Sequence, residues 1–290
     1  MDRAEITARA ASATLSVARA AGLAVHSAKL IGGYANTMFR VEPLPLVARV
    51  ATASHAVRAG GTDWLKRETE VAAFLASAGA KAIRPATIVS PGPHVCDGLA
   101  LTFWDYAELT GQSVSPELLG ERLCALHEAM ADCPVALPKL EALAETWRIL
   151  ETPDYLGKLD AESIALIARR SDAIRHELER RPLDCRPLHG DAHHGNLWQT
   201  PNGPVWGDFE DTHLGPVEWD LACMVASSHV FGCGAAAEVA LASYGKSHDT
   251  DVLDLLIEAR TLQGVAWSLV TQSEPSNNNR LKRRLAWLDT

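Results

Sequence analysis

The stretch that decides the fold is Leu188-His189-Gly190-Asp191-Ala192-His193-His194-Gly195-Asn196-Leu197, a dense run of polar residues in an apolar setting. Twelve residues after Asn196 comes Asp208, within the stretch Trp206-Gly207-Asp208-Phe209-Glu210-Asp211. Between them, Asn202-Gly203 predicts a tight hairpin turn that joins Leu197-Trp198 to Val205-Trp206. The pattern therefore predicts a polar loop, a hairpin, and a second loop that begins at Asp208.

Asp191, Asn196 and Asp208 have the side chains that phosphoryl transfer requires. A carboxylate must lie beside the attacking hydroxyl to orient it and to accept its proton, which is the role we assign to Asp191. A second carboxylate and an amide oxygen must hold Mg2+ against the phosphates, because this ion prefers hard oxygen ligands. The order of Asp191, Asn196 and Asp208 is that of the catalytic-loop Asp, the metal Asn and the metal Asp in the protein-kinase template.

Three linked motifs resemble those of the aminoglycoside phosphotransferase / choline kinase-like family: His189-Gly190-Asp191-x4-Asn196, Gly207-Asp208-Phe209-Glu210 and Asp220-Leu221-Ala222. The resemblance covers roughly residues 30–225. It implies an α+β, protein-kinase-like fold with two lobes. Residues 1–106 would form a nucleotide-binding N-lobe with a small antiparallel sheet and one helix. Residues 107–290 would form a larger, mainly helical C-lobe with the catalytic loop and the acceptor site, and Asp220 would support that loop.

The resemblance also implies a set of nucleotide-binding residues in the first half of the chain. Gly32-Gly33 with Asn36 matches the glycine turn over the phosphates, and Arg49 matches the basic residue of a strand. Glu68 follows Arg49 by nineteen residues, which makes it the favoured partner on the next helix. Glu70 is the alternative, but it lies about 200° around the helix from Glu68, so only one of them can face Arg49.

A hinge that binds adenine through its backbone is implied at Phe103-Trp104-Asp105-Tyr106, with Trp104 and Tyr106 as the candidate residues. The chain departs from the kinase pattern in three places. The first loop lacks a complete G-x-G-x-x-G, and Arg49 stands where lysine is usual, although arginine is always charged and can hold phosphate bidentately. Phe209-Glu210 replaces Phe-Gly, so no flipping activation switch is expected.

Apolar periodicity and turn residues predict the remaining elements. Strands are expected at 25–31, 37–42, 46–50 and 99–104, and helices at 2–20, 63–78, 116–131, 139–150, 160–181, 217–229, 234–246 and 250–272. The Pro-rich segment 83–93 is expected to be irregular, and strands give way to helices near 105–112. The basic cluster of Arg280, Lys282, Arg283 and Arg284 is expected on a solvated helix face.

Composition narrows the class of partner. The 290 residues are 47% hydrophobic and carry 27 basic against 36 acidic side chains, a net charge of -9, which disfavours nucleic acid as a partner. The first twenty residues contain no uninterrupted apolar run and no apolar stretch approaches about 18 residues, so neither a secretory signal nor a membrane partner is expected. The six cysteines form no C-x-x-C pair, which predicts buried free thiols in a cytoplasmic protein. The oligomeric state is left open.

The acceptor is the least determined part of the function. The resemblance implies ATP as the phosphate donor, with GTP left open, and Mg2+. It also implies a small hydroxyl-bearing acceptor such as an aminoglycoside-like antibiotic, an amino sugar or an amino alcohol. The acidic balance and the pair Glu210-Asp211 slightly favour a cationic acceptor, which Glu210, Asp211 and His213 would line. The sequence does not decide whether the acceptor is an antibiotic and the activity a resistance activity.

Two alternatives remain at the level of sequence. The first is a nucleotide-binding protein on the same fold that is catalytically silent. The second is a metal-dependent hydrolase, suggested by the clustered histidines, in which Zn2+ would be held by His189, Asp191, His193, His194 and Asp208.

Overall fold

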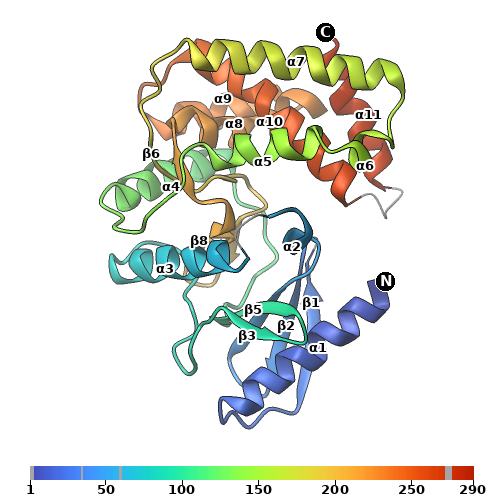
Figure 1. Ribbon diagram of the computed structural model, residues 1–290. Coiled ribbons are helices and arrows are strands. Elements are labelled where there is room, and N and C mark those ends of the chain that lie inside the picture. Colours follow the sequence, from blue (N-terminus) through green and yellow to red (C-terminus); the bar gives the residue numbers. More distant parts are fainter. Residues whose placement is uncertain (1–2, 34, 59–60, 272–275) are drawn as a thin grey trace. The chain divides into compact units, whose positions relative to one another are not determined.

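The computed structural model describes residues 3–33, 35–58, 61–271 and 276–290 (Figure 1). The chain divides into two compact units. Unit 1 consists of Met1–Thr110 and Thr200–Glu210, and unit 2 consists of Gly111–Gln199 and Asp211–Thr290. Each unit has its own secondary structure and its own buried core.

Unit 1 is built on a five-stranded antiparallel sheet with the strand order β1-β2-β3-β5-β4. Its strands are β1 (Ser27–Gly32), β2 (Asn36–Glu42), β3 (Leu46–Ala51), β4 (His94–Cys96) and β5 (Leu99–Asp105). Its helices are α1 (Arg3–Ala20), α2 (Ser54–Val57) and α3 (Asp63–Ser77). The strands expected at 25–31, 37–42, 46–50 and 99–104 are confirmed, whereas the short β4 and α2 were not predicted.

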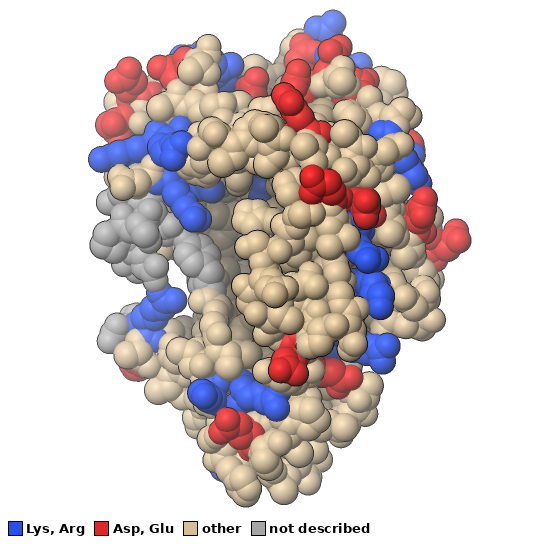
Figure 2. All heavy atoms as spheres, turned by 180° about the vertical axis from the view of Figure 1, so that it is seen from behind, with Lys and Arg blue, Asp and Glu red and all other residues tan. Residues whose placement is uncertain are grey.

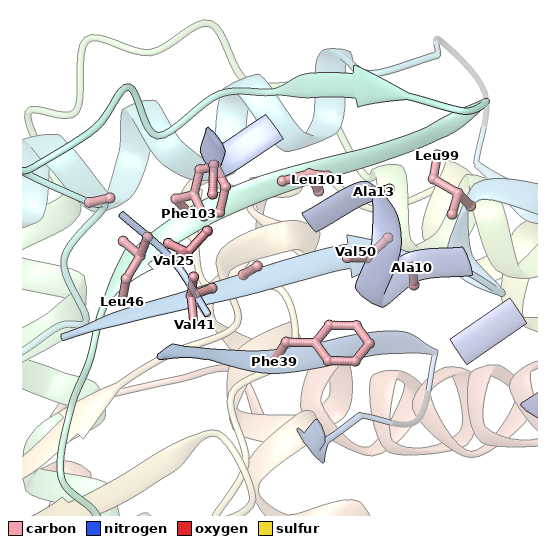
Figure 3. Close-up of a cluster of buried hydrophobic side chains, with 13 residues drawn as sticks. Ala10, Ala13, Val25, Phe39, Val41, Leu46, Val50, Leu99, Leu101 and Phe103 are labelled. Carbon is pink, nitrogen blue, oxygen red and sulfur yellow. The ribbon is translucent and has the colours of Figure 1, made fainter. Parts of the chain in front are cut away.

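The two faces of this sheet have different roles, because successive side chains of a strand point to opposite faces. One face packs against α1, where Ala10 and Ala13 lie close to buried side chains of β2, β3 and β5 such as Phe39 and Val50 (Figure 3). Ala51 and Ala100 belong to the other face and pack with Trp64 and Leu65 of α3. Arg49 has the same parity as Ala51, so β3 directs it toward the face that α3 covers.

The hairpin predicted at Asn202-Gly203 is present and is formed by β7 (Leu197–Thr200) and β8 (Gly203–Trp206). Its second half joins unit 1 through the backbone of Trp206, which donates to the Lys81 carbonyl and accepts from Ile83 N–H, both at 2.8 Å. These bonds explain why unit 1 includes Thr200–Glu210, which a division of the sequence into consecutive halves does not anticipate. Asp208 and Glu210 therefore belong to the same unit as Arg49.

Unit 2 is mainly helical, as expected. Its helices are α4 (Pro116–Met130), α5 (Glu141–Leu150), α6 (Pro153–Leu156), α7 (Ala161–Glu179), α8 (Val217–Phe231), α9 (Gly234–Tyr244), α10 (Thr250–Val270) and α11 (Ser276–Leu288). The short strands β6 (Arg186–Leu188) and β9 (His213–Gly215) pair antiparallel on either side of the polar loop. Helix α10 lies among α5, α7, α8 and α11, which explains why most of its residues are apolar (Figure 1).

Some details of the surface differ from expectation. Arg284 does not lie on a solvated helix face, because its guanidinium donates to the Gly264 carbonyl (3.0 Å) and the Ser268 hydroxyl (3.1 Å) of α10. The cysteines are free thiols, but Cys233 is exposed and only Cys223 of the six is buried. Asp2, Tyr34 and Gln272, which the predicted first helix, glycine turn and 250–272 helix include, lie outside the described residues.

Basic and acidic side chains are interspersed on the face of the molecule that Figure 2 shows. Within the part of the chain that the structure describes, no helix combines the length and the apolar character that a membrane crossing requires.

Candidate active site

Arg49 is the centre of a buried ion network in unit 1. Its side chain is 6% exposed and its guanidinium contacts three carboxylates. One nitrogen, Nη1, donates to Glu68 of α3, and the other, Nη2, donates to Asp208 Oδ1 (2.7 Å) and to Glu210 Oε2. The network thus joins a strand, a helix and the loop after the hairpin, which are far apart in the sequence.

The structure resolves which glutamate of α3 faces Arg49. Glu68 is fully buried and pairs with Arg49. Glu70 is exposed and lies 3.7 Å from Lys66 Nζ, one turn earlier on the same helix. The structure therefore shows the pairing that the nineteen-residue separation favoured.

Glu210 is also part of this network, a position that the sequence did not predict. Its Oε2 accepts from Asn36 Nδ2 (2.9 Å), and its Oε1 lies 3.3 Å from Arg58 Nη2. Arg58 also donates to the Glu210 carbonyl (3.0 Å) and stacks over Trp64, with its Cζ 4.7 Å from the ring centroid. The buried Glu210 thus connects Arg49, Arg58 and the glycine turn, which makes it a better candidate for organising the nucleotide site than for lining an acceptor pocket.

The charges of this cluster depend on the protonation of Glu68. Glu68, Asp208 and Glu210 face the guanidiniums of Arg49 and Arg58. Burial disfavours the charged form of Arg49, but the carboxylates of Asp208, Glu210 and Glu68 more than offset this and hold its pKa above the usual range. Burial raises the pKa of Glu68 to about 8, although the charge of Arg49 opposes that shift. With Glu68 protonated, the carboxylates of Asp208 and Glu210 balance the guanidiniums of Arg49 and Arg58.

Asp208 is the carboxylate of the cluster that is most accessible to a further cation. Its side chain is 33% exposed, against 8% or less for Glu68 and Glu210. Its φ of 65° lies in the left-handed region, which few residues other than glycine, asparagine and aspartate adopt. Residues held in such conformations cluster at functional sites.

The glycine turn is close-packed around Gly33. A Cβ at this position would lie 1.9 Å from the Asn36 carbonyl oxygen, and its φ is +122°, so only glycine fits. Asn36 is buried, and its Oδ1 accepts from the Ser54 hydroxyl while its amide donates to Glu210. The turn is thereby tied to the Arg49 network.

Trp104 and Tyr106 lie at and just after the end of β5, where the adenine hinge was expected. Trp104 is buried and its indole donates to Thr102 Oγ1 (2.9 Å), whereas Tyr106 is exposed and Arg40 stacks on its ring at 3.4 Å. The Tyr106 N–H donates to the Pro45 carbonyl (2.9 Å). An adenine contact through this N–H would have to displace that bond.

In unit 2, Asp191 lies in a loop that holds its carboxylate from several sides. Asn196 Nδ2 donates to Asp191 Oδ2 and to the Asp191 carbonyl, both at 3.0 Å. Arg260 of α10 donates to Oδ1, and His193 Nε2 lies 3.4 Å from Oδ2. Burial would raise the pKa of Asp191, but Arg260, His193 and His189 hold it well below its usual range. Asp191 is therefore ionised and oriented.

Asp220 supports this loop, as the resemblance implied. Its oxygens accept from the N–H groups of His189 and Gly190, both at 2.8 Å, and one lies 2.9 Å from His127 Nε2. The Trp219 indole donates to the Gly190 carbonyl (2.8 Å). Gly190 itself has a φ of +87°, and a Cβ there would lie 1.9 Å from the Asp211 carbonyl oxygen. The backbone before Asp191 is thus fixed in place on a buried scaffold.

The remaining predicted acceptor residues differ in exposure. His213 is 1% exposed, its Nδ1 lies 2.7 Å from the Asp211 carbonyl, and its ring packs edge-on against Trp219. Asp211 is half-buried and its charge acts on Arg260.

The sequence analysis did not identify Arg260 as a site residue. An arginine in the middle of a largely apolar helix nevertheless indicates that its side chain needs a buried partner.

The two units offer different donors to a metal ion. Among the described residues, no three His, Cys, Asp or Glu side chains gather as a metal-binding set, so the five residues of the zinc hypothesis are not assembled into one. Mg2+ requires fewer protein ligands, since it binds through one or two protein oxygens together with substrate phosphates. In unit 1, Asp208 offers an accessible carboxylate. In unit 2, Asn196 turns its amide nitrogen to Asp191, which leaves its amide oxygen for a cation. Each of these groups, taken by itself, is an oxygen donor of the kind that Mg2+ prefers.

The raised pKa of Glu68 predicts how stability depends on pH. The folded chain retains a proton on Glu68 between about pH 4.5 and about pH 8 that the unfolded chain releases. This contribution to stability is present in full below about pH 4.5 and is lost as the pH rises through about 8. We expect Glu68→Gln, which stays neutral, to lose less Tm than wild type between about pH 6 and about pH 9. Glu70→Gln is the matched control and should follow wild type, and equal losses in all three proteins would contradict the burial argument.

Comparisons with known proteins were made for sequence and for structure. A sequence model of the APH phosphotransferase enzyme family matches residues 26–256. No curated protein shows a significant match to the chain.

Several solved structures share the fold at low sequence identity. Amicoumacin kinase hAmiN, in complex with AMP-PNP, Ca2+ and Ami, is 14% identical with a TM-score of 0.73, over 99% of this chain and 96% of that chain. Choline kinase LicA from Streptococcus pneumoniae is 14% identical with a TM-score of 0.66, over 95% and 98%. APH(2")-IIia, in complex with GDP and kanamycin, is 16% identical with a TM-score of 0.65, over 95% and 97%. These likenesses show a common fold.

Proposed function

Because the chain belongs to the APH phosphotransferase enzyme family, we propose that it is a kinase that transfers the γ-phosphoryl group of ATP to a hydroxyl of a small molecule. The observation that carries this proposal is the contact of Arg49 with both Glu68 and Asp208. It joins the phosphate-binding cation, the helix glutamate and the metal-binding aspartate of the kinase template, which come from three separate motifs. The chain shares its fold with amicoumacin kinase, with choline kinase and with a phosphotransferase solved in complex with kanamycin. This likeness supports a small molecule as the acceptor.

In this proposal unit 1 binds the nucleotide. Arg49, oriented by Glu68 and Glu210, contacts the phosphates, and the turn at Gly33 and Asn36 covers them. The segment that includes Trp104 and Tyr106 meets the adenine. Asp208 and Asn196 would hold Mg2+, which neutralises charge on the phosphates when it is bound.

Asp191 acts on the acceptor. It accepts a hydrogen bond from the acceptor hydroxyl and aligns its oxygen with the γ-phosphorus. The new bond joins that oxygen to phosphorus, the bond from phosphorus to the β-phosphate oxygen breaks, the hydroxyl proton passes to Asp191, and ADP leaves. Because the pKa of Asp191 is held low, it is a weak base, and its main contribution is orientation. This suits a loose transition state, in which the proton moves late.

The proposal is tested by coupled ADP release with Mg2+ and either ATP or GTP. The acceptor panel contains aminoglycosides, other hydroxylated antibiotics, choline, amino sugars and hydroxy acids. We expect ADP release that depends on one class of acceptor and is lost in Asp191→Ala. Nucleotide binding without ADP release for any acceptor would instead favour the catalytically silent alternative. The proposal includes a cytoplasmic location, where ATP is available and free thiols are stable.

A further inference from the structure

Arg260 places a positive charge in direct contact with Asp191, the residue that we propose binds the acceptor hydroxyl. It lies on α10, and its guanidinium donates through Nη2 to Asp191 Oδ1 and through Nη1 to Gln263 Oε1, one turn further along the helix. Among the described residues these are its hydrogen-bond partners. A guanidinium has five N–H donors in a planar fork, so further donors remain, and 19% of the side chain is exposed.

Other basic groups surround the same loop. His193 lies 3.4 Å from Asp191 Oδ2, and its ring centroid is 5.8 Å from that of His194. Arg260 is the permanently charged cation in contact with Asp191.

Two carboxylates of unit 2, Asp191 and Asp211, act on Arg260. A third, Glu218, is buried and accepts from the Asp249 N–H at the start of α10 (2.8 Å). A cationic acceptor at Asp191 would place its charge beside the Arg260 guanidinium. The net acidity of the whole chain therefore does not describe the field at this loop.

We propose that Arg260 binds a carboxylate of the acceptor, and that the substrate is a compact hydroxy acid whose hydroxyl lies at Asp191. This assignment rests on the proposed kinase function and replaces the cationic acceptor that composition favoured. Arginine matches a carboxylate with two parallel hydrogen bonds, which fixes the orientation of the ligand as well as binding it.

The contact between Arg260 and Asp191 also limits the size of the acceptor. Each hydrogen bond spans about 2.7–3.0 Å, so a hydroxyl on Asp191 and a carboxylate on the free edge of the guanidinium are close neighbours. About two to four carbon atoms are enough to join them. A long polycation such as an aminoglycoside has neither this short carbon chain nor a carboxylate.

The test compares ligands that differ only in charge. L-Serine is paired with L-serinamide, and 4-hydroxybutanoate with 4-hydroxybutanamide, with choline and kanamycin as cationic probes. Binding to the full chain is measured by calorimetry in the presence of AMP-PNP and Mg2+, so that it does not depend on turnover. Wild type is compared with Arg260→Gln, Arg260→Lys and the control Arg169→Gln, which removes an exposed charge on α7 of the same unit.

We expect wild type to bind at least one acid about 10- to 100-fold more tightly than its amide, since charge-assisted hydrogen bonds have this strength. Arg260→Gln should remove the preference, Arg260→Lys should keep part of it, and Arg169→Gln should leave it unchanged. Equal binding of acid and amide, tighter binding of the cationic probes, or no acid-selective binding at all would overturn the proposal.

A purely positioning role for Arg260 gives a different result. In that case Arg260→Gln would lower kcat for acids, amides and cationic acceptors alike and leave the acid-to-amide ratio of kcat/KM unchanged, which also overturns the carboxylate assignment. Failure of the kinase function is recognised separately, because it removes ADP release for every acceptor, whereas failure of this inference leaves turnover of neutral or cationic acceptors intact.

Discussion

Replacing Asp191 by asparagine is expected to lower kcat about a thousandfold or more while leaving nucleotide affinity close to that of wild type. The carboxylate is the group that orients the hydroxyl and accepts its proton, and such a group contributes about 10²–10⁴-fold to the rate. Asparagine keeps the size of the side chain, so the loop supported by Asp220 should retain its shape. Steady-state kinetics with the best acceptor and a nucleotide titration measure the two effects separately.

The control for Asp191 is Asp184→Asn, which removes a carboxylate that is 80% exposed in the same unit. It should keep wild-type kcat. If Asp191→Asn retains wild-type turnover, Asp191 is not the acceptor-binding carboxylate and the catalytic assignment fails.

Replacing Asp208 by asparagine is expected to abolish Mg2+-dependent nucleotide binding and to lower kcat/KM by about 10²-fold or more, because a hard carboxylate ligand is lost. Asparagine tolerates the left-handed backbone at φ 65°, so the effect reports the charge and not the strain that alanine would add. Calorimetric titration of ATP with and without Mg2+ checks the loss. We expect the Mg2+-dependent part of the binding to disappear.

Asp97→Asn is the matched control for Asp208, since Asp97 is also in unit 1 and has a φ of 51°, but its side chain is 66% exposed and pairs with Arg9. It should bind ATP and Mg2+ as wild type does. A Mg2+ dependence that is the same in Asp208→Asn, Asp97→Asn and wild type would remove Asp208 from the metal site.

Local patterns in the sequence were sufficient for much of the fold. Strands β1, β2, β3 and β5, helices α4, α5 and α7 to α10, and the hairpin at Asn202-Gly203 follow from periodicity and turn chemistry. The pairing of Arg49 with Glu68 followed from the nineteen-residue separation of the family pattern, and helix geometry showed only that Glu68 and Glu70 cannot both face Arg49. The support of the catalytic loop by Asp220 followed from the family resemblance.

What the sequence did not predict depends on contacts between distant segments. Glu210 follows the metal motif and was expected near the acceptor, but backbone bonds of Trp206 to Lys81 and Ile83 bring its segment into unit 1 beside Arg49. Arg260 is separated from Asp191 by 69 residues, and no motif marks it. Which of these residues pair depends on how helices and loops pack together. The periodicity of a single sequence contains no information on that packing.

The charge of the acceptor also could not be predicted from the composition of the chain. A net charge of -9 is a property of the whole surface, whereas binding is decided by the groups within a few ångströms of Asp191. There, Arg260 is the cation in contact with Asp191.

The most direct test of the kinase assignment follows the transferred phosphate itself. The purified chain is incubated with Mg2+, ATP labelled in its γ-phosphate and the acceptor panel, and the label is located by chromatography. We predict that it moves to the hydroxyl of a small molecule with wild type and with Asp184→Asn, but not with Asp191→Asn. Label that stays in ATP or appears only as inorganic phosphate with every acceptor, while the chain binds ATP, would contradict the assignment.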